Sequence, residues 1–502
     1  MSNLVAAPVL LPLATAILLF PLRNRRRLER GVSLLSAVGL LLFSSWLMLL
    51  AARGEILVLP LGSWSPLVGI VWVVDRLSAV MLVVSGIISL ATLVYARGGL
   101  RPERETRFFY PLHQLIMAGV CGSLVTGDFF NLFVFFEVML IASFALMTLG
   151  ARSRQLHRSF AYVLVSLVGS LLLFVGVGVV YGTAGTVNMA ELSRRVASMP
   201  LPPTFWAAVA LMLVAFSLKA ALVPFFFWLP DSYPEAPLPS AALFAGLLTK
   251  VGVYTLFRVV PLISGPNPGP LLSVLVGLSA LTMLLGVLGA LGRGTVRGIL
   301  SFHIVSQVGY MVFGLALFTV TGLAAGLFYT VHNILAKSAL FLSGGLCERI
   351  GESGRLGQVR GLAKTHPWAA VGFFVPAMAL AGIPPFSGFW AKLLVIIAGF
   401  REGAFVTTTV AIAVGFLTLC SMLKIWNAVF WGAPSGQLHP ERGHDWRMVG
   451  PPLSLAALTV ILGLGAAQFF GYTEAAASQL LARTPYVDAV LGSPGLATKG
   501  PR

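Results

Sequence analysis

The sequence predicts an all-α polytopic membrane protein with about fourteen transmembrane helices. Of its 502 residues, 57% are hydrophobic and only 10% are charged, and the mean hydropathy is +0.91. A soluble globular chain carries about 25% charged residues, so a large water-soluble core is excluded. Apolar runs of about 20 residues, long enough to cross the hydrocarbon core as a helix, recur along the whole chain.

The apolar runs can be placed in chain order. They lie near residues 3–22, 31–52, 74–96, 108–126, 128–150, 159–182, 204–227, 239–260, 271–291, 299–318, 322–346, 368–399, 404–430 and 449–470. The first run has its basic residues after it, at 23–27, which is the reverse of a cleaved signal peptide. We therefore expect a retained first helix, and after the last helix a tail of weak helical character with no assigned role.

The charges of the loops predict the orientation. Six of the seven loops that follow odd-numbered runs hold 20 of the 34 Lys and Arg residues, and the seventh, 228–238, holds none. Because basic loops stay in the cytoplasm, both termini are expected outside. The net charge of +17 does not indicate nucleic acid, because the basic residues are dispersed over short loops instead of clustering on one soluble face.

Two of the predicted helices, the seventh and the twelfth, are interrupted by proline. The seventh contains Pro224 and leads into the proline-rich stretch 228–237, and the twelfth contains Pro384 and Pro385. Proline removes a backbone donor and clashes with the preceding turn. The backbone groups that this frees inside a membrane must face protein or a water-filled cavity. Paired breaks in two halves of a chain are typical of a transport site at the interface of an inverted repeat.

Five of the ionisable residues within the predicted helices are treated together, and we call them the charged series. They are Glu137, Lys219, Lys250, Lys337 and Lys392. A charge at mid-bilayer costs at least about 2.5–3.5 kcal/mol on insertion scales, and such residues mark ion and proton paths. The alternatives are a static ion pair that locks two helices, or a side chain that reaches the interface, as we expect for Lys424 near the end of its helix. We expect Glu137 and Lys219 to pair, with a proton released when they separate.

Polar residues form stripes on the tenth and eleventh predicted helices. The first stripe is His303, Ser306, Gln307 and Tyr310, and the second is Thr330, Asn333 and Lys337, with His332 about one residue around the helix. The i, i+3, i+4, i+7 spacing puts each set on one helical face. Such a face either binds a neighbouring helix by hydrogen bonds or lines water. The lysine and two histidines favour a hydrated proton path.

Motifs of soluble enzymes are missing from the sequence. It contains no Walker A loop, no dinucleotide fingerprint in a strand–helix context and no HExxH. The three cysteines, Cys121, Cys347 and Cys420, lie far apart without metal-ligand spacing. We expect no cofactor, no metal and no catalysis by the chain alone.

These residues together resemble the antiporter-like membrane subunits of respiratory complex I, membrane-bound hydrogenases and multisubunit Mrp cation/proton antiporters. The resemblance rests on runs at 127–137, 217–219, 228–237, 249–254, 332–337 and 384–392. The first, Gly-Asp-Phe-Phe-Asn-Leu-Phe-Val-Phe-Phe-Glu, is most similar to the D subunits of Mrp antiporters.

The resemblance implies a role for each member of the charged series. It implies that Glu137 is the key acid of the fifth helix, Lys219 its partner and Lys250 the central relay lysine. It also implies that Lys337 and Lys392 continue the path, with His303 and His332 as relay or hydration sites.

For the whole chain, the resemblance implies an inverted repeat between residues 108–260 (helices 4–8) and 271–430 (helices 9–13). These are flanked by residues 1–107 (helices 1–3) and 449–502 (the last helix and the tail). It further implies a prokaryotic cell membrane, partner subunits in a hetero-oligomer, and protons exchanged for a monovalent cation such as Na⁺.

Two other functions remain open at this point. The same residues suit a proton-pumping subunit of a complex I-like NADH:quinone oxidoreductase or a hydrogenase. A stand-alone transporter of an organic solute, with its binding pocket at the two helix breaks, is the third possibility.

Overall fold

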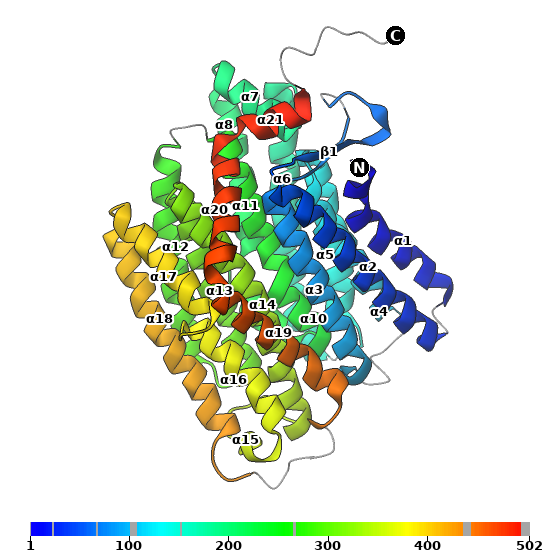
Figure 1. The fold of residues 1–502 in the computed structure, drawn as a ribbon, viewed down its shortest axis with the longest axis vertical. Helices are drawn as coiled ribbons and strands as arrows, with labels where there is room; N and C mark the ends of the chain where they lie inside the picture. The colour runs from blue at the N-terminus through cyan, green and yellow to red at the C-terminus, as the bar shows by residue number, and fades with distance from the viewer. Residues whose placement is uncertain are drawn as a thin grey trace.

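The computed structural model describes residues 2–22, 25–66, 69–100, 108–150, 153–264, 268–434 and 443–492. The described chain is a bundle of long helices (Figure 1). Its only described sheet is a short antiparallel pair, β1 (Leu57–Pro60) and β2 (Val71–Val74). The predicted all-α fold class is confirmed.

Among the described residues, eleven helical segments are long and apolar enough to cross a membrane. They are η1–α1 (Ser2–Ala6 and Ala7–Leu22), α2 (Arg26–Ala52), α3 (Arg76–Gly99), α5 (Phe129–Thr148), α6 (Ser153–Ala184), α8 (Pro203–Ala220), α10–η4–α11 (Leu238–Leu243, Phe244–Leu248 and Thr249–Ile263), α12 (Pro270–Gly292), α13 (Val296–Ala316), α18–η5 (Phe405–Ile425 and Trp426–Phe430) and α19 (Trp446–Leu464). The other three predicted positions hold α4 (Phe109–Val125), α14 (Val320–Gly351) and the pair α16 (Pro367–Ala381) and α17 (Ser387–Arg401).

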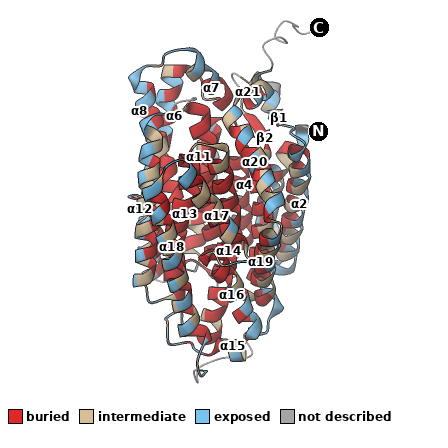
Figure 2. Cartoon of the chain, turned by 60° about the vertical axis from the view of Figure 1, so that its left-hand side comes forward, coloured by how far each residue is buried: buried red, intermediate tan, exposed pale blue. Residues whose placement is uncertain are grey.

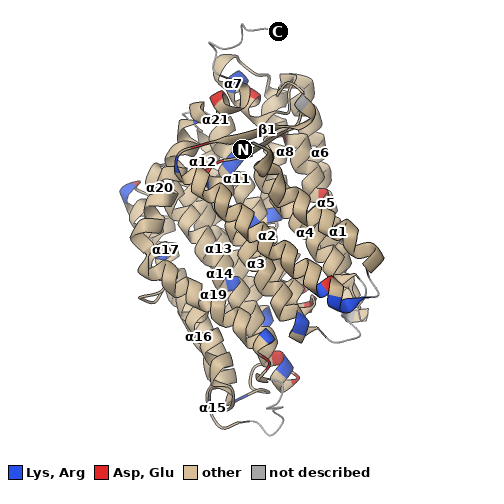
Figure 3. Ribbon diagram, turned by 45° about the vertical axis from the view of Figure 1, so that its right-hand side comes forward, with Lys and Arg blue, Asp and Glu red and all other residues tan. Residues whose placement is uncertain are grey.

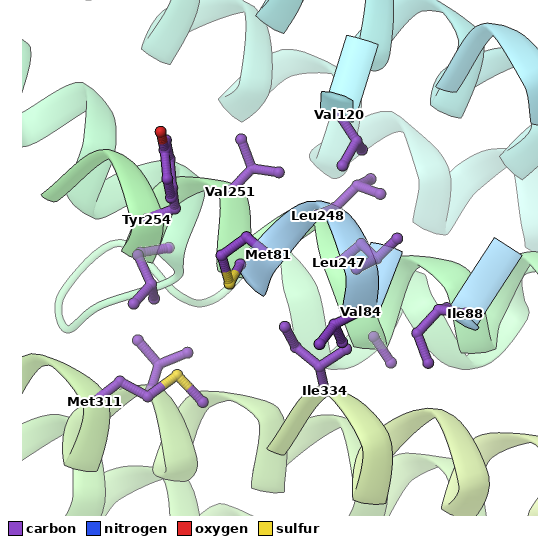
Figure 4. Packing of buried hydrophobic residues seen from close by; sticks show 14 of the residues in the cluster. Met81, Val84, Ile88, Val120, Leu247, Leu248, Val251, Tyr254, Met311 and Ile334 are labelled. Atoms are coloured by element: carbon purple, nitrogen blue, oxygen red, sulfur yellow. The ribbon is translucent and has the colours of Figure 1, made fainter. Parts of the chain in front are cut away.

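Burial separates central helices from peripheral ones (Figure 2). Every residue of α11 is buried, as is nearly all of α13 and α14, whereas α6 and α12 expose one apolar side. Val84 of α3, Leu247 before α11 and Ile334 of α14 lie close to one another in this core (Figure 4). An exposed apolar side is expected where lipid surrounds the bundle. The charged series therefore has to be accommodated on helices that protein surrounds.

Both predicted helix breaks are present. The helix α8 ends at Ala220, where Ala221 takes the left-handed conformation with φ 62°, and α16 ends at Ala381, where Gly382 has φ 91°. A cis X-Pro peptide follows in each break, at Pro224 and Pro385. The seventh helix is thus shorter than the predicted 204–227. Two short helices, α9 (Leu229–Ser232) and η3 (Tyr233–Glu235), then lead to α10.

The carboxyl-terminal region differs from the prediction. After α19 the chain continues into α20 (Ala466–Ala482) and α21 (Thr484–Leu491), where a weakly helical tail was expected. The helix α20 packs on α14 and α3, and α21 packs on α7 (Met189–Ser198) and β1. Hydropathy misses α20 because polar residues such as Glu474 and Gln479 lower its apolar signal. Because η1 also contacts β1, the first and last described helices lie at the same end of the bundle (Figure 1).

Candidate functional site

Glu137 and Lys219 occupy neighbouring helices but form no ion pair in the described structure. Asp128 caps α5 by accepting a hydrogen bond from the Asn131 amide at 2.7 Å, which fixes Glu137 about two and a half turns further along the helix. The Oε1 atom of Glu137 is buried, and no described residue forms a hydrogen bond with it. The two charges nevertheless lie close enough to interact. The predicted partners are therefore near each other, in a separated arrangement.

Lys219 is bound instead by α6, in a contact that sequence analysis missed. Its Nζ donates to the Ser166 carbonyl at 3.0 Å and to Ser170 Oγ at 3.4 Å. Ser159, Ser166 and Ser170 are buried and share one face of α6. The three serines form a polar face within a mostly apolar stretch, and from this pattern the contact with Lys219 could have been predicted.

Lys250 is fully buried and bonds to its own helix. Its Nζ donates to the Ala245 carbonyl at 2.7 Å. Ala245 belongs to η4, a π-helical turn whose wider spacing alters the regular hydrogen-bond ladder one turn before the lysine. No carboxylate among the described residues pairs with Lys250. The lysine is therefore held by a backbone dipole without a counter-ion.

A glycine brings Lys250 close to the end of α8. A Cβ atom built on Gly252 would lie 2.5 Å from the Ala220 backbone nitrogen and 2.9 Å from the Lys219 carbonyl carbon. Only a residue without a side chain fits at this crossing. The contact fixes α11 directly against the turn that carries Lys219.

The second half of the chain places two further lysines in the core. Lys337 Nζ donates to the Leu300 carbonyl at 3.2 Å, and Lys392 Nζ donates to the Ala381 carbonyl at 2.9 Å, at the end of α16. Lys392 also lies 5.5 Å from the centre of the Tyr310 ring. Lys337 lies close enough to Lys250 and Lys392 for their like charges to repel one another. All four lysines of the charged series are buried, and each bonds to a backbone carbonyl.

Three members of the predicted polar stripes donate hydrogen bonds to backbone carbonyls. Ser306 donates to the Met283 carbonyl of α12 at 3.0 Å, and Thr330 donates to the Gly326 carbonyl of its own helix at 2.8 Å. Tyr310 donates to the Ala411 carbonyl of α18. The Ser306 and Tyr310 contacts join helices by hydrogen bonds, which was the alternative interpretation of a polar stripe.

The other stripe residues keep polar atoms that no described residue satisfies. His303 contacts Ser421, His332 Nδ1 lies 2.8 Å from Ser387 Oγ, and Gln307 accepts a hydrogen bond from Tyr329. The unpartnered atoms are His303 Nδ1, Gln307 Nε2, His332 Nε2 and both amide atoms of Asn333. Ser387, Ser421 and Tyr329 were missed, because each becomes relevant only through a contact with another helix. Buried polar atoms are otherwise satisfied by protein or by ordered water.

Asp75 and Arg258 form a buried ion pair outside the charged series. Asp75 caps α3 by accepting a hydrogen bond from the Ser78 amide, and it also pairs with Arg258 through contacts of 2.6 and 2.7 Å. Arg258 lies within α11 and only 4% of its side chain is exposed, so the two charges join α3 to α11 inside the bundle.

Asp75→Asn is expected to destabilise the protein strongly, because it leaves the Arg258 charge buried without its partner. Breaking a buried pair in this way costs about 3–5 kcal/mol. Thermal unfolding of the purified protein in its membrane assembly measures the effect. The control is Asp231→Asn, whose carboxylate is exposed and 3.0 Å from Arg293; an exposed pair is worth about 0–1 kcal/mol. Equal losses in the two variants would contradict the prediction.

Comparisons with known proteins agree with this architecture. The model of the family described as NADH:quinone oxidoreductase/Mrp antiporter, TM, matches residues 126–418. The Na(+)/H(+) antiporter D subunit of Alkalihalophilus pseudofirmus is 42% identical over 98% of this chain and 100% of that protein. A chain in the Mrp complex of Dietzia sp. DQ12-45-1b is 38% identical, with a TM-score of 0.91, over 98% of this chain and 99% of its own length. A chain of the membrane-bound sulfane sulfur reductase, an archaeal respiratory membrane complex, is 25% identical, with a TM-score of 0.92, over 98% and 100% of the two lengths.

Proposed function

This chain belongs to the NADH:quinone oxidoreductase/Mrp antiporter family, and on that premise we propose that its charged series carries protons in a multisubunit Na⁺/H⁺ antiporter. It is a multi-pass membrane protein of a bacterial Mrp-type complex, and its partners are the other subunits. The roles of the individual residues, Na⁺ as the exchanged cation and the outside position of both termini are parts of the proposal.

One observation carries the proposal: four buried lysines, spread over both halves of the bundle, are held by backbone carbonyls instead of carboxylates. A lysine that is not locked by a counter-ion can take up and release a proton at a modest free-energy cost. The unpartnered polar atoms of His303, Gln307, His332 and Asn333 lie on α13 and α14, which carry or contact the second-half lysines. Water bound to these atoms would complete a path for protons.

Glu137 and Lys219 lie at one end of the proposed path, where their ion pair can open and close. Lys219 is bound to α6 in the separated arrangement, and a movement of its side chain toward α5 would close the pair. Closing would favour the charged form of both groups, and opening would favour release of a proton from lysine. The two helix breaks support the proposed repeat of residues 108–260 and 271–430, because each begins at a left-handed residue beside a lysine of the series.

A redox-driven proton pump is the second candidate, and the degree of similarity weighs against it. The relatives named as antiporter subunits, or taken from an Mrp complex, are 42% and 38% identical, compared with 25% for the chain of the sulfane sulfur reductase. These relatives are all chains of larger complexes, which weighs against a stand-alone transporter of an organic solute.

Lys337→Met is the test of the proposed path. Removal of a relay group is expected to lower Na⁺-driven proton efflux about 10²-fold or more, measured in vesicles that carry the whole complex. Lys424→Met is the matched control, because Lys424 Nζ caps α12 at the Leu291 and Arg293 carbonyls, at 2.8 and 2.9 Å. Exchange should persist in the control. Normal exchange by Lys337→Met would overturn the proposed path.

A further inference from the structure

A groove on the surface of the bundle has a basic end between α2, α3 and α19. Arg27, Arg30, Arg97 and Arg447 line this end together with Leu34 and Leu35 of α2. The side chains of Arg27, Arg97 and Arg447 make no ion pair with any described residue. Four guanidinium groups therefore converge on one hollow.

The groove continues as an apolar channel along the same three helices. Its lining includes Leu41 and Leu42 of α2, Val83 and Ile87 of α3, and Leu455 of α19. From Val83 to Val94, which both line the channel, α3 rises about 16 Å at 1.5 Å per residue. That length is close to one leaflet of hydrocarbon, which is half of a core about 30 Å thick. A charged head and an apolar channel of one leaflet's depth are thus joined end to end.

Two acidic residues lie near the ends of these helices, and the four arginines of the basic end outnumber them. Glu29 is buried in the first turn of α2, and Asp445 caps α19 by accepting a hydrogen bond from the Arg447 amide at 2.9 Å. The basic end belongs to the chain segments predicted to face the cytoplasm, where the leaflet carries anionic lipid. Figure 3 shows Lys and Arg residues gathered toward the end of the bundle opposite α7 and α21.

We propose that this groove binds one anionic phospholipid, independently of how the charged series transports protons. The phosphate diester lies among the four arginines, and an acyl chain lies along the apolar channel between α2, α3 and α19. Guanidinium groups suit a phosphate because their planar donors bind two of its oxygens at once. The site spans α2, α3 and α19, so the bound lipid holds α2 and α3 against α19.

The test measures lipid binding to the purified, delipidated complex by native mass spectrometry, with dioleoyl phosphatidylglycerol as the probe. The variant Arg97→Gln/Arg447→Gln is expected to bind this lipid about 25-fold more weakly, from about fivefold for each arginine near an anionic group. Arg360→Gln/Lys364→Gln removes two exposed charges of other cytoplasmic segments and is expected to bind it as the unmodified complex does. Equal losses in the two double variants would overturn the proposal.

Further measurements distinguish lipid binding from the binding of free phosphate or of another subunit. Inorganic phosphate is expected not to displace the lipid, because it lacks the acyl chain, and Ser45→Phe is expected to weaken lipid binding by filling the channel. Displacement by phosphate, or equal binding of phosphatidylcholine, would refute the site.

A photoreactive benzoylphenylalanine in place of Leu42, which is 65% exposed, is expected to cross-link to lipid in the whole complex. Cross-linking to another subunit would show that protein fills the groove and would refute the proposal.

Discussion

Glu137→Gln is expected to abolish Na⁺-driven proton efflux by vesicles that carry the whole complex, a loss of about 10²-fold or more. The amide keeps the shape of the side chain but can neither take up a proton nor attract the Lys219 ammonium. No ion-pair attraction would then favour closing of the separated pair, so Lys219 would stay bound to the Ser166 carbonyl. Proton release at this end of the path would stop.

The structure also predicts that Glu137→Gln leaves the protein intact. Glu137 forms no ion pair among the described residues, so the amide leaves no buried cation without a partner. The amount of complex in the membrane and its thermal unfolding should therefore stay close to those of the unmodified complex. Glu55→Gln, at an exposed position, controls for loss of a carboxylate. Normal exchange by an assembled Glu137→Gln complex would refute the assignment of Glu137.

Hydropathy predicted most of the fold because lipid-facing helices must be apolar over a fixed length. It failed at α20, which packs on α14 and carries polar residues on its other sides. The break after α8 was predicted from its prolines, but its start at Ala221 was not, since a left-handed alanine has no sequence signature. A helix that carries polar residues among its apolar ones, as α20 does, is thus poorly visible to hydropathy even where it packs on protein.

The charged series was predictable because ionisable residues are costly within a membrane, so their presence alone is informative. Their hydrogen-bond partners were not predictable. The Ser166, Ala245, Leu300 and Ala381 carbonyls that bind the four lysines are main-chain atoms, and any residue type supplies one. The position of the π-helical turn before Lys250 depends on packing against neighbouring helices, which the local sequence does not encode.

Lys250→Met is expected to impair proton transport without lowering the stability of the protein. Lys250 is fully buried and has no carboxylate partner among the described residues, so its charge weakens the fold. Methionine has a similar length and no charge, and it needs no hydrogen bond. We expect thermal stability to stay the same or rise, while Na⁺-driven proton efflux falls about 10²-fold or more, because the central relay group between the two halves is gone.

Arg258→Met, two turns further along α11, is the matched comparison. There the same replacement leaves Asp75 buried without its cation, and stability is expected to fall by about 3–5 kcal/mol. Two buried cations on one helix thus have opposite predicted effects on stability, because one is paired and the other is not. If Lys250→Met lost stability as Arg258→Met does, Lys250 would be a structural residue. If it kept normal exchange, protons would have to pass between the two halves without it.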